Sequence, residues 1–253
     1  LYERARILGC DAIVTGHYAR IEQENGRWLL KKSLDESKDQ SYVLYSLTQD
    51  QLAHTRLPLG AMHKSETRRI AEKQGFYNAD KPDSQDICFV PDGDYAGFIA
   101  RYTGRDCPAG DFVDESGHVL GRHKGIVHYT VGQRKGLGIG GRKESLFILS
   151  TDVAQNVIYV GEGDAHPGLW RPALYIAPEE VHWVNPSREM ASGASARFSV
   201  RIRYRQPLQG ATLHMRPNGV YILFDEPQRG ITPGQFAAWY DGDELVGSGV
   251  ISE

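Results

Sequence analysis

The first residues of the chain show a helical pattern followed by a short apolar stretch. Residues 2–8 predict a helix that ends at Gly9, because glycine readily adopts the left-handed conformation that closes a helix. Residues 12–15 are almost entirely apolar, which is typical of a buried strand in a parallel sheet. Loops at the carboxyl ends of such strands hold ligands in α/β proteins, so Gly16 and His17 occupy a candidate ligand site. A lone histidine is more often structural, and both interpretations of His17 stay open.

Turn and helix signals continue to about residue 104. Residues 18–22 and 27–32 flank a turn at 24–26 and predict a hairpin. Polar N-caps and closing glycines then mark several helices. The predicted helices cover residues 42–47, 49–55, 66–74 with Ser65 as N-cap, and 94–102 with Asp92 as N-cap and Gly104 at the end.

From about residue 105 onward nearly every apolar segment has the pattern of a strand. Residues 111–113 and 118–120 predict one hairpin, and residues 146–149 and 157–160 predict a second. Residues 166–172 have the composition of a linker. The last eighty or so residues carry short strands at regular spacing, as in a small barrel or sandwich. The pattern therefore predicts an α/β part followed by all-β parts.

The composition is that of a globular protein of more than one domain, with 253 residues, 40% hydrophobic and 24% charged. No apolar run approaches the roughly 18 residues of a membrane span, so we expect a cytoplasmic protein with no membrane partner. Cys10, Cys88 and Cys107 are odd in number and irregularly spaced, which favours a reducing compartment. No CxxC pair is present, and no metal site is expected.

The formal net charge of -3 argues against a nucleic-acid partner, but the distribution of charge argues for one. Residues 116–143 and 196–216 each contain several Lys or Arg and no Asp or Glu. Within 197–205, polar and mostly cationic side chains alternate with apolar ones, which predicts a strand with an arginine face. Such a face could be solvated on an edge strand. Arginines without a neighbouring acid favour RNA or another polyanion.

The glycine-rich segment 136–141 contains a literal GxGxxG sequence. A dinucleotide-binding fingerprint must follow a strand and open a helix, whereas the next apolar run here has the pattern of a strand. We therefore reject the dinucleotide interpretation. Because 133–135 is Gln-Arg-Lys, the segment is interpreted as a flexible basic loop that contacts phosphates or is solvated.

Cys88 follows four polar side chains and Ile87 and precedes an apolar pair, in the segment Asp83-Ser84-Gln85-Asp86-Ile87-Cys88-Phe89-Val90. This environment indicates a reactive thiol on a loop. A cysteine with its ordinary pKa of about 8.5 is mostly protonated at pH 7, so activation must come from the fold or a substrate. The alternative is a small buried hydrophobic residue.

Six segments in order along the chain resemble the tRNA-specific 2-thiouridylase family, whose members replace oxygen with sulfur at C2 of the wobble uridine. The resemblance implies part of a PP-loop ATP-pyrophosphatase domain in 1–104, a central β domain in 105–166 and a tRNA-contacting C-terminal β-barrel in 167–253. The segments that carry it are 12–18 (AIVTGHY), 38–42 (KDQSY), 83–89 (DSQDICF), 129–138 (YTVGQRKGLG), 203–206 (RYRQ) and 232–235 (TPGQ).

The resemblance also implies a reaction and the residues that take part in it. In the family, ATP, with Mg²⁺, activates the uridine O2, and a cysteine persulfide loaded by a sulfur-donor protein delivers the sulfur. Cys88 matches the persulfide-bearing cysteine, and Gly16 matches a backbone position near ATP, where a side chain would block close approach. The positions that match tRNA contacts are His17, Lys38, Asp39, Gln40, Arg203, Tyr204 and Gln235.

The sequence departs from the family at two points. The SGGVDS loop that cradles the ATP phosphates is absent, and so is the earlier cysteine that works with the one matched by Cys88. Since residue 1 is a leucine rather than a methionine, at the start of a helical run, we expect the C-terminal part of a longer protein. Because adenylation needs the absent loop and resolution of the persulfide needs the absent cysteine, we expect this chain alone to be unable to thiolate tRNA. The alternatives are a non-catalytic RNA-binding module of the β domains and a cysteine hydrolase, which would need a histidine beside Cys88.

Overall fold

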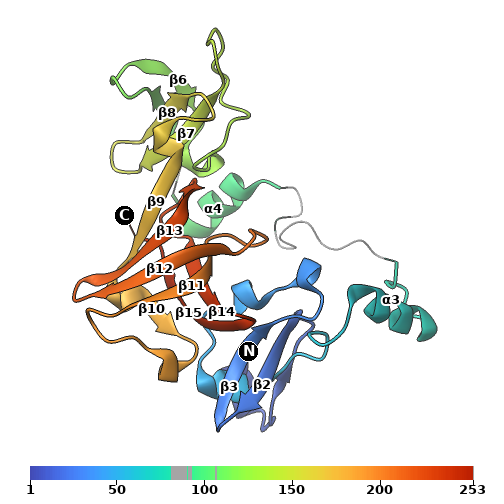
Figure 1. Cartoon of the computed structure of the whole chain (residues 1–253). Coiled ribbons are helices and arrows are strands. Elements are labelled where there is room, and N and C mark those ends of the chain that lie inside the picture. Colours follow the sequence, from blue (N-terminus) through green and yellow to red (C-terminus); the bar gives the residue numbers. More distant parts are fainter. Residues whose placement is uncertain (81–89, 91–92, 106, 253) are drawn as a thin grey trace. The chain divides into compact units, whose positions relative to one another are not determined.

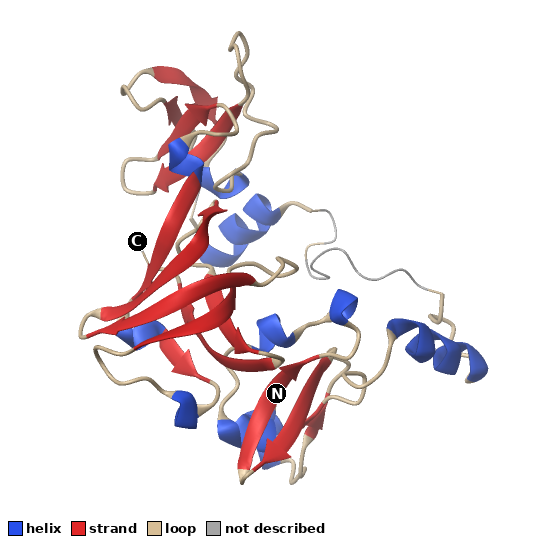
Figure 2. Ribbon diagram, in the orientation of Figure 1, coloured by secondary structure: helices blue, strands red, loops and turns tan. Residues whose placement is uncertain are grey.

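The structure is a computed structural model that describes residues 1–80, 90, 93–105 and 107–252 (Figures 1 and 2). The chain forms two compact units, each of which is described by itself. Unit 1 combines Leu1–Lys81 with Pro172–Glu226 and Pro233–Glu253. Unit 2 consists of Pro82–Arg171 and Pro227–Thr232. The first and last parts of the sequence therefore belong to one unit.

The N-terminal part of unit 1 is mixed α/β. Gly9, at φ +70°, follows the first helix as predicted, and the first strand is parallel to its neighbour as predicted. The strand is only partly covered, since Val14 is 68% exposed, so the expectation of a buried strand is wrong for the described residues. The elements are α1 (Tyr2–Ile7), β1 (Ile13–Val14), η1 (Glu36–Lys38), η2 (Ser41–Leu44), α2 (Gln49–Ala53), β4 (Thr55–Arg56) and α3 (Lys64–Lys73).

Two helix starts differ from the prediction. α3 begins at Lys64 with His63 in the N-cap position, so Ser65 lies inside the helix and does not cap it. In unit 2, α4 (Tyr95–Thr103) is capped by Asp94, whose side chain accepts a hydrogen bond from the Gly97 backbone N–H. The predicted cap, Asp92, lies outside the described residues. Both differences arise because several consecutive polar residues could each have capped the helix.

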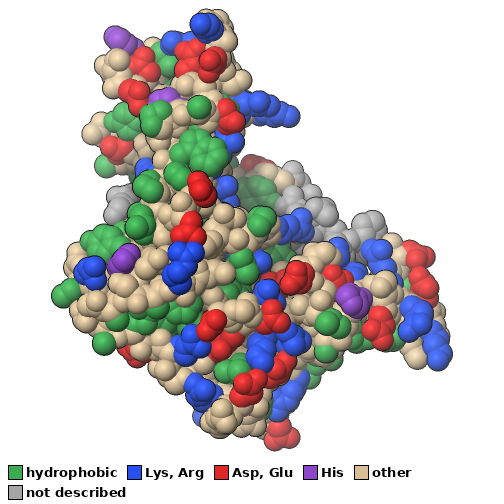
Figure 3. Space-filling view, viewed as in Figure 1, with side chains coloured by type: hydrophobic (Ala, Val, Ile, Leu, Met, Phe, Trp, Pro, Cys, Tyr) green, Lys and Arg blue, Asp and Glu red, His purple; other side chains and the backbone are tan. Residues whose placement is uncertain are grey.

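The hairpin of β2 (Ala19–Glu24) and β3 (Arg27–Lys32) turns at Asn25 and Gly26, both with positive φ, as the sequence predicts. The hairpin also joins the large sheet, because Lys31 of β3 pairs with Glu244 of β15. Ion pairs cross this junction: Lys32 Nζ lies 3.1 Å from Asp243 Oδ1, and Arg20 Nη2 lies 3.0 Å from Asp243 Oδ2. Figure 3 shows the resulting mixture of basic and acidic side chains over the hairpin.

The large sheet follows the strand order β2-β3-β15-β14-β11-β12-β13-β9, with β10 paired to β15. Its burial alternates as a period of two requires: in β11, Phe198 and Val200 are buried while the residues between them are more exposed. The C-terminal strands are β9 (Trp170–Ile176), β10 (Val181–Trp183), β11 (Ser195–Arg201), β12 (Gln209–Arg216), β13 (Gly219–Arg229), β14 (Phe236–Asp241) and β15 (Glu244–Val250). β9 runs through Arg171-Pro172, so the predicted linker is wrong there.

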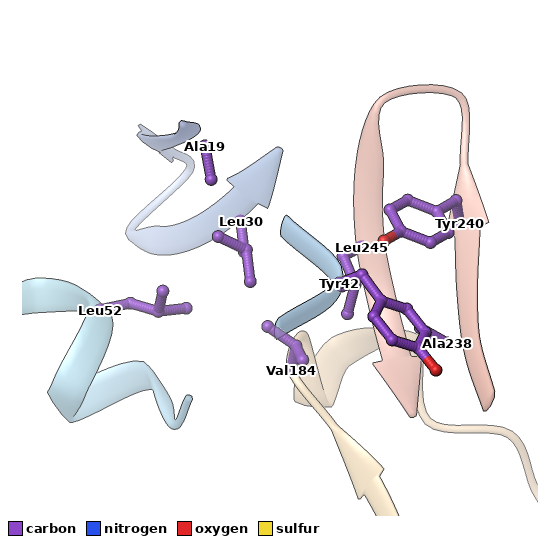
Figure 4. Close-up of a cluster of buried hydrophobic side chains, with 8 residues drawn as sticks. All are labelled: Ala19, Leu30, Tyr42, Leu52, Val184, Ala238, Tyr240 and Leu245. Carbon is purple, nitrogen blue, oxygen red and sulfur yellow. The ribbon is translucent and has the colours of Figure 1, made fainter. Parts of the chain in front are cut away.

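One hydrophobic core of unit 1 contains residues from both ends of the sequence (Figure 4). Leu30 and Leu52 come from the N-terminal part, and Ala238, Tyr240 and Leu245 come from the C-terminal strands, all at 1% exposure or less. Burial of this apolar surface stabilises the contact between the two parts. The full cluster is Ala19, Leu30, Tyr42, Leu52, Val184, Ala238, Tyr240 and Leu245.

Unit 2 contains α4 and a four-stranded sheet in the order β6-β5-β8-β7. Both hairpins predicted in this region are present, and β5 also pairs in parallel with β8. The core is formed by Phe112, Leu137, Leu146, Ile148, Ile158 and Val160. The strands are β5 (Gly110–Val113), β6 (Val119–His123), β7 (Leu146–Asp152) and β8 (Val157–Glu162), and short 3₁₀ helices of this unit lie at Ile126–His128 and Pro167–Leu169. Two further 3₁₀ helices, Pro178–Glu180 and Pro186–Arg188, belong to unit 1.

Within the described residues, no helix has the length and apolar character needed to cross a membrane.

Candidate nucleic-acid interface

Asp39 is a buried anchor between the N-terminal part of unit 1 and strand β11. Its Oδ1 accepts hydrogen bonds from the backbone N–H groups of Ser33 (3.2 Å) and Ser41 (3.1 Å). Its Oδ2 accepts from the Ser41 hydroxyl (3.0 Å) and from Arg201 Nη1 (3.1 Å). The Asp39 side chain is 2% exposed, so the carboxylate is occupied by the protein itself. Asp39 therefore shapes the segment that bears Lys38 and Gln40.

Arg201 is held by the same cluster. Its side chain is 11% exposed, and its guanidinium carbon lies 5.6 Å from the centre of the Tyr240 ring. The Tyr240 hydroxyl shares a 3.1 Å hydrogen bond with Ser41. Burial raises the pKa of Tyr240 above its ordinary value, so the hydroxyl stays protonated. An arginine expected to face solvent thus belongs to a buried network.

Four aromatic rings stack beside this network. Tyr45 and Tyr42 lie against Phe236, with ring centroids 3.8 Å and 4.2 Å away. Tyr204 stacks on Tyr42, with ring centroids 6.4 Å apart and an interplanar angle of 28°. Tyr42 is buried and donates its hydroxyl hydrogen to the Phe236 carbonyl at 2.8 Å, whereas Tyr204 is 38% exposed. Tyr204 is therefore the most exposed ring of this stack.

The segment that contains Gly16 and His17 lies beside the segment that contains Lys38–Gln40. The Gln40 backbone N–H donates to the Tyr18 carbonyl (2.7 Å), and the Tyr18 N–H donates to Gln40 Oε1 (2.9 Å). His17 Nδ1 lies 2.9 Å from the Thr15 hydroxyl. Thr15 therefore holds the Nδ1 side of the His17 ring. The two hydrogen bonds between Tyr18 and Gln40 place the chain at His17 close to the chain at Gln40.

Gly16 is exposed at the end of β1. A Cβ added there would meet only Leu59 Cδ1, at 3.6 Å, which is ordinary van der Waals contact. The fold itself therefore has room for a side chain at this position.

Lys38 lines an open cavity of about 510 Å³ with the N-terminal half of α3. Tyr18 fixes this helix, because its hydroxyl donates to Thr67 Oγ1 at 3.1 Å and Lys64 Nζ lies 5.4 Å from its ring centre. Asp35 accepts the Lys64 backbone N–H at 3.0 Å, and this hydrogen bond is the main cause of the lowered pKa of Asp35. The sequence pattern does not reveal the basic side chains of this cavity, which are His63, Lys64, Arg68 and Arg69.

The arginine-rich segment differs from the prediction in its pairing. Arg197 Nη1 lies 2.9 Å from Asp225 Oδ1, and Arg201 pairs with Asp39, so the expectation of unpaired arginines is wrong for both. β11 ends at Arg201, and Arg205, with φ at +69°, lies in the following turn with its guanidinium 5.5 Å from the Tyr204 ring centre. The acids that pair these arginines are distant in sequence, so local composition could not reveal them.

Several predicted site residues of unit 1 are sequence neighbours of Tyr42 or of the rings that stack on it. Tyr204 and Phe236 both stack on the Tyr42 ring. Arg203 directly precedes Tyr204 and Gln235 directly precedes Phe236, and both are partly exposed. Asp39 and Gln40 directly precede η2, the helix that carries Tyr42. Cys88 lies outside the described residues. Within the described ranges, no group of three or more His, Cys, Asp or Glu side chains could hold a metal ion.

Three family models match successive parts of the chain. Residues 1–92 match a model described as the tRNA methyl transferase HUP domain. Residues 96–162 match the tRNA methyl transferase PRC-barrel domain. Residues 175–251 match the aminomethyltransferase beta-barrel domain.

Several curated proteins are similar over nearly the whole chain, and each is named tRNA-specific 2-thiouridylase MnmA. The protein of Christiangramia forsetii is 43% identical over 280 residues, which cover 97% of this chain and 71% of that protein. The protein of Clostridioides difficile is 42% identical over 255 residues, covering 100% and 68%. The protein of Geotalea uraniireducens is 45% identical over 253 residues, covering 99% and 65%. The chain belongs to the MnmA family of tRNA-specific 2-thiouridylases, with a HUP domain followed by a PRC-barrel domain and a β-barrel domain.

Proposed function

We propose that this protein acts in the formation of 2-thiouridine in tRNA and that unit 1 binds the tRNA through the residues around Tyr42. The observation that carries the proposal is the convergence of residues that are far apart in sequence. Tyr204 stacks on Tyr42, which follows the Lys38–Gln40 segment, and that segment is hydrogen-bonded to Tyr18, next to His17. Of these, Tyr204, the Lys38–Gln40 segment and His17 are positions that the family resemblance associates with tRNA.

The residues have different roles in this proposal. The exposed ring of Tyr204 stacks on an RNA base, and base–aromatic stacking contributes about 1–3 kcal/mol per base. Lys38 and Arg203 contact phosphates, and His17 offers its Nε2. Asp39 is a positioning residue, because its carboxylate is filled by Arg201 and the Ser41 groups. The role of Asp39 is to hold Lys38 and Gln40 in place.

We also propose that Gly16 belongs to an ATP site. Because a Cβ at Gly16 would meet only Leu59 Cδ1, the packing of the fold does not require a glycine at this position. The close approach of a ligand to the backbone would explain the glycine instead. The backbone of Gly16 would lie against the nucleotide, and Mg²⁺ would be held mainly through the nucleotide phosphates. When bound, ATP would supply the group that makes the uridine O2 a leaving group.

For Cys88 we propose the role of persulfide carrier. The Cys88 thiolate would attack the outer sulfur of a persulfide on a donor protein, forming the Cys88 persulfide and releasing the donor cysteine as a thiolate. The outer sulfur of the Cys88 persulfide would then attack C2 of the activated uridine as the activated oxygen leaves. A second cysteine thiol, the partner that the family resemblance implies, would attack the Cys88 sulfur, so that the S–S bond to the transferred sulfur breaks, a disulfide forms with Cys88 and the sulfur stays on C2.

The experiment that tests this function compares the 253-residue chain with its Cys88→Ala variant, using a persulfide-loaded donor and tRNA. We expect wild type to gain one transferable sulfur and to bind tRNA, and the variant to bind tRNA equally well without accepting sulfur. A wild-type thiol that never accepts sulfur, with intact tRNA binding, would favour a non-catalytic RNA-binding module. Absence of tRNA binding by wild type would contradict the proposed function itself.

A further inference from the structure

The glycine-rich segment 132–143 of unit 2 forms a basic loop that carries four exposed cationic side chains. None of Arg134, Lys135, Arg142 and Lys143 has a carboxylate within 4 Å in the described part of the chain, and all four are exposed. The two arginines of β11, by contrast, are paired with Asp225 and Asp39. Of the two basic stretches, 116–143 and 196–216, the first therefore contributes the cationic side chains of this loop to the surface.

The loop is fixed at its base by backbone and side-chain hydrogen bonds. The Gly132 N–H donates to the Ile148 carbonyl (2.7 Å), and the Ile148 N–H donates to the Gln133 carbonyl (3.0 Å), which ties the loop to β7. The Gln133 side chain accepts from the Thr130 N–H and donates to the Lys135 carbonyl. The sequence interpretation of a flexible loop therefore needs correction for the first half of the loop. This half is hydrogen-bonded to β7 through Gly132 and Gln133, and internally through the Gln133 side chain.

Apolar side chains anchor the middle of the loop. Leu137 is 7% exposed in the core with Phe112 and Ile148, and Ile139 packs against the same core. Gly136, Gly138 and Gly141 have φ values of +81°, +70° and +76°, which glycine adopts at low cost. These conformations let the chain turn on both sides of Leu137 and after Ile139. The anchors leave the two cationic pairs outside, one on each side.

The surface between the cationic pairs is an open cavity of about 610 Å³, bordered by Arg134, Arg142 and Lys143 and by the glycine backbone. Among the described residues no aromatic side chain lines it, and Cβ atoms added at Gly138 or Gly140 would meet nothing within 4 Å. One acid, Glu144, also borders it, and Arg142 additionally borders a neighbouring cavity that contains Asp114 and Glu162. This chemistry suits phosphates in an exposed backbone and offers no ring for stacking on a base.

We propose that the basic loop of unit 2 binds the sugar–phosphate backbone of the same tRNA that unit 1 binds, without reading its sequence. This inference rests on the proposed function, since it assumes a tRNA substrate. Arg and Lys contacts to phosphates release counterions and therefore produce a salt-dependent affinity. Because the two units are parts of one chain, a second contact on the same RNA adds to the first through a raised effective concentration.

The test measures the affinity of the 253-residue chain for an unmodified tRNA transcript over a series of salt concentrations. The variants are Lys143→Ala and the double variant Arg134→Ala with Lys143→Ala. The matched control is Arg122→Ala, which removes one charge from the same unit at an exposed side chain that faces Asp111 at 3.9 Å. Thermal unfolding of each variant confirms that its fold is kept.

We expect Lys143→Ala to weaken binding by roughly two- to fivefold, as for an exposed ion pair, and Arg122→Ala to leave it unchanged. The double variant should reduce the log–log salt slope by about 0.7 to 0.9 for each phosphate that the loop no longer binds. The same weakening for tRNAs of different sequence would support binding to the backbone. Unchanged affinity and salt slope in the double variant, with wild-type tRNA binding intact, would overturn the loop inference while leaving the proposed function standing. If wild type binds no tRNA, both fail.

Discussion

Arg201 and Asp39 form a buried ion pair, with Arg201 Nη1 3.1 Å from Asp39 Oδ2 and side chains that are 11% and 2% exposed. The pair joins strand β11 to the turn before η2, across 162 positions of sequence. Both residues lie in stretches where the sequence indicates contact with RNA, yet in the structure their charges pair with each other. The pair positions the proposed tRNA-binding residues without itself occupying the surface.

Asp39→Asn should strongly destabilise the protein, because it leaves the Arg201 cation buried without its counter-charge. Breaking one side of a buried ion pair typically costs about 3–5 kcal/mol in the free energy of unfolding, measurable by urea denaturation. The double variant Asp39→Asn with Arg201→Met should be less destabilised than Asp39→Asn alone. Arg197→Ala is the matched control, because its pair with Asp225 is exposed and should contribute little. Equal losses of stability for Asp39→Asn and Arg197→Ala would show that burial of the pair has no effect.

The junction between the hairpin and the large sheet should lose stability in acid. The hydrogen bond from Lys32, with the charges of Lys32 and Arg20, holds the pKa of Asp243 below its ordinary value of 3.8. A carboxyl whose pKa is lowered in the folded state stabilises the fold at pH values above its unfolded-state pKa. This contribution is lost as the pH falls through its folded-state pKa. Asp243→Asn should therefore be less stable than wild type at pH 7, and the difference should shrink below about pH 4. A difference in unfolding free energy that is the same at pH 7 and pH 2.5 would contradict this assignment.

Gly16 and Gly60 should respond oppositely to alanine. A Cβ at Gly16 meets only Leu59 Cδ1 at 3.6 Å, so Gly16→Ala should change the free energy of unfolding by no more than about 0.5 kcal/mol. A Cβ at Gly60 would lie against the Ala19 carbonyl, closer than any contact between such atoms allows, so Gly60→Ala should lower the unfolding temperature markedly. A large loss of stability in Gly16→Ala would mean that the fold requires this glycine and would remove the argument for a ligand there.

Local features of the fold could be predicted from the sequence, and long-range partners could not. Asn25-Gly26, Gly9 and Gly104 determine turns and helix ends through their own backbone conformations, and all three were predicted correctly. The pairing of β3 with β15 depends on residues more than 200 positions apart, and no periodic pattern encodes it.

The candidate site shows the same division. The period-two pattern of 197–205 correctly places Phe198 and Val200 inward, but the acids that neutralise Arg197 and Arg201 come from β13 and from Asp39. The cations of α3 beside Lys38 were missed because charged side chains on a short helix are usually only solvated. Their proximity to Lys38 depends on the packing of Tyr18 against Thr67 and Lys64.

The most direct test of the account is the tRNA affinity of Tyr204→Ala compared with Tyr221→Ala. Both tyrosines belong to unit 1 and are 38% exposed, but only Tyr204 stacks on Tyr42. Removal of one base-stacking interaction of about 1–3 kcal/mol should weaken tRNA binding by roughly fivefold to a hundredfold in Tyr204→Ala, while Tyr204→Phe and Tyr221→Ala remain close to wild type. Equal affinities for Tyr204→Ala and Tyr221→Ala would contradict the claim that the residues around Tyr42 form the tRNA-binding site.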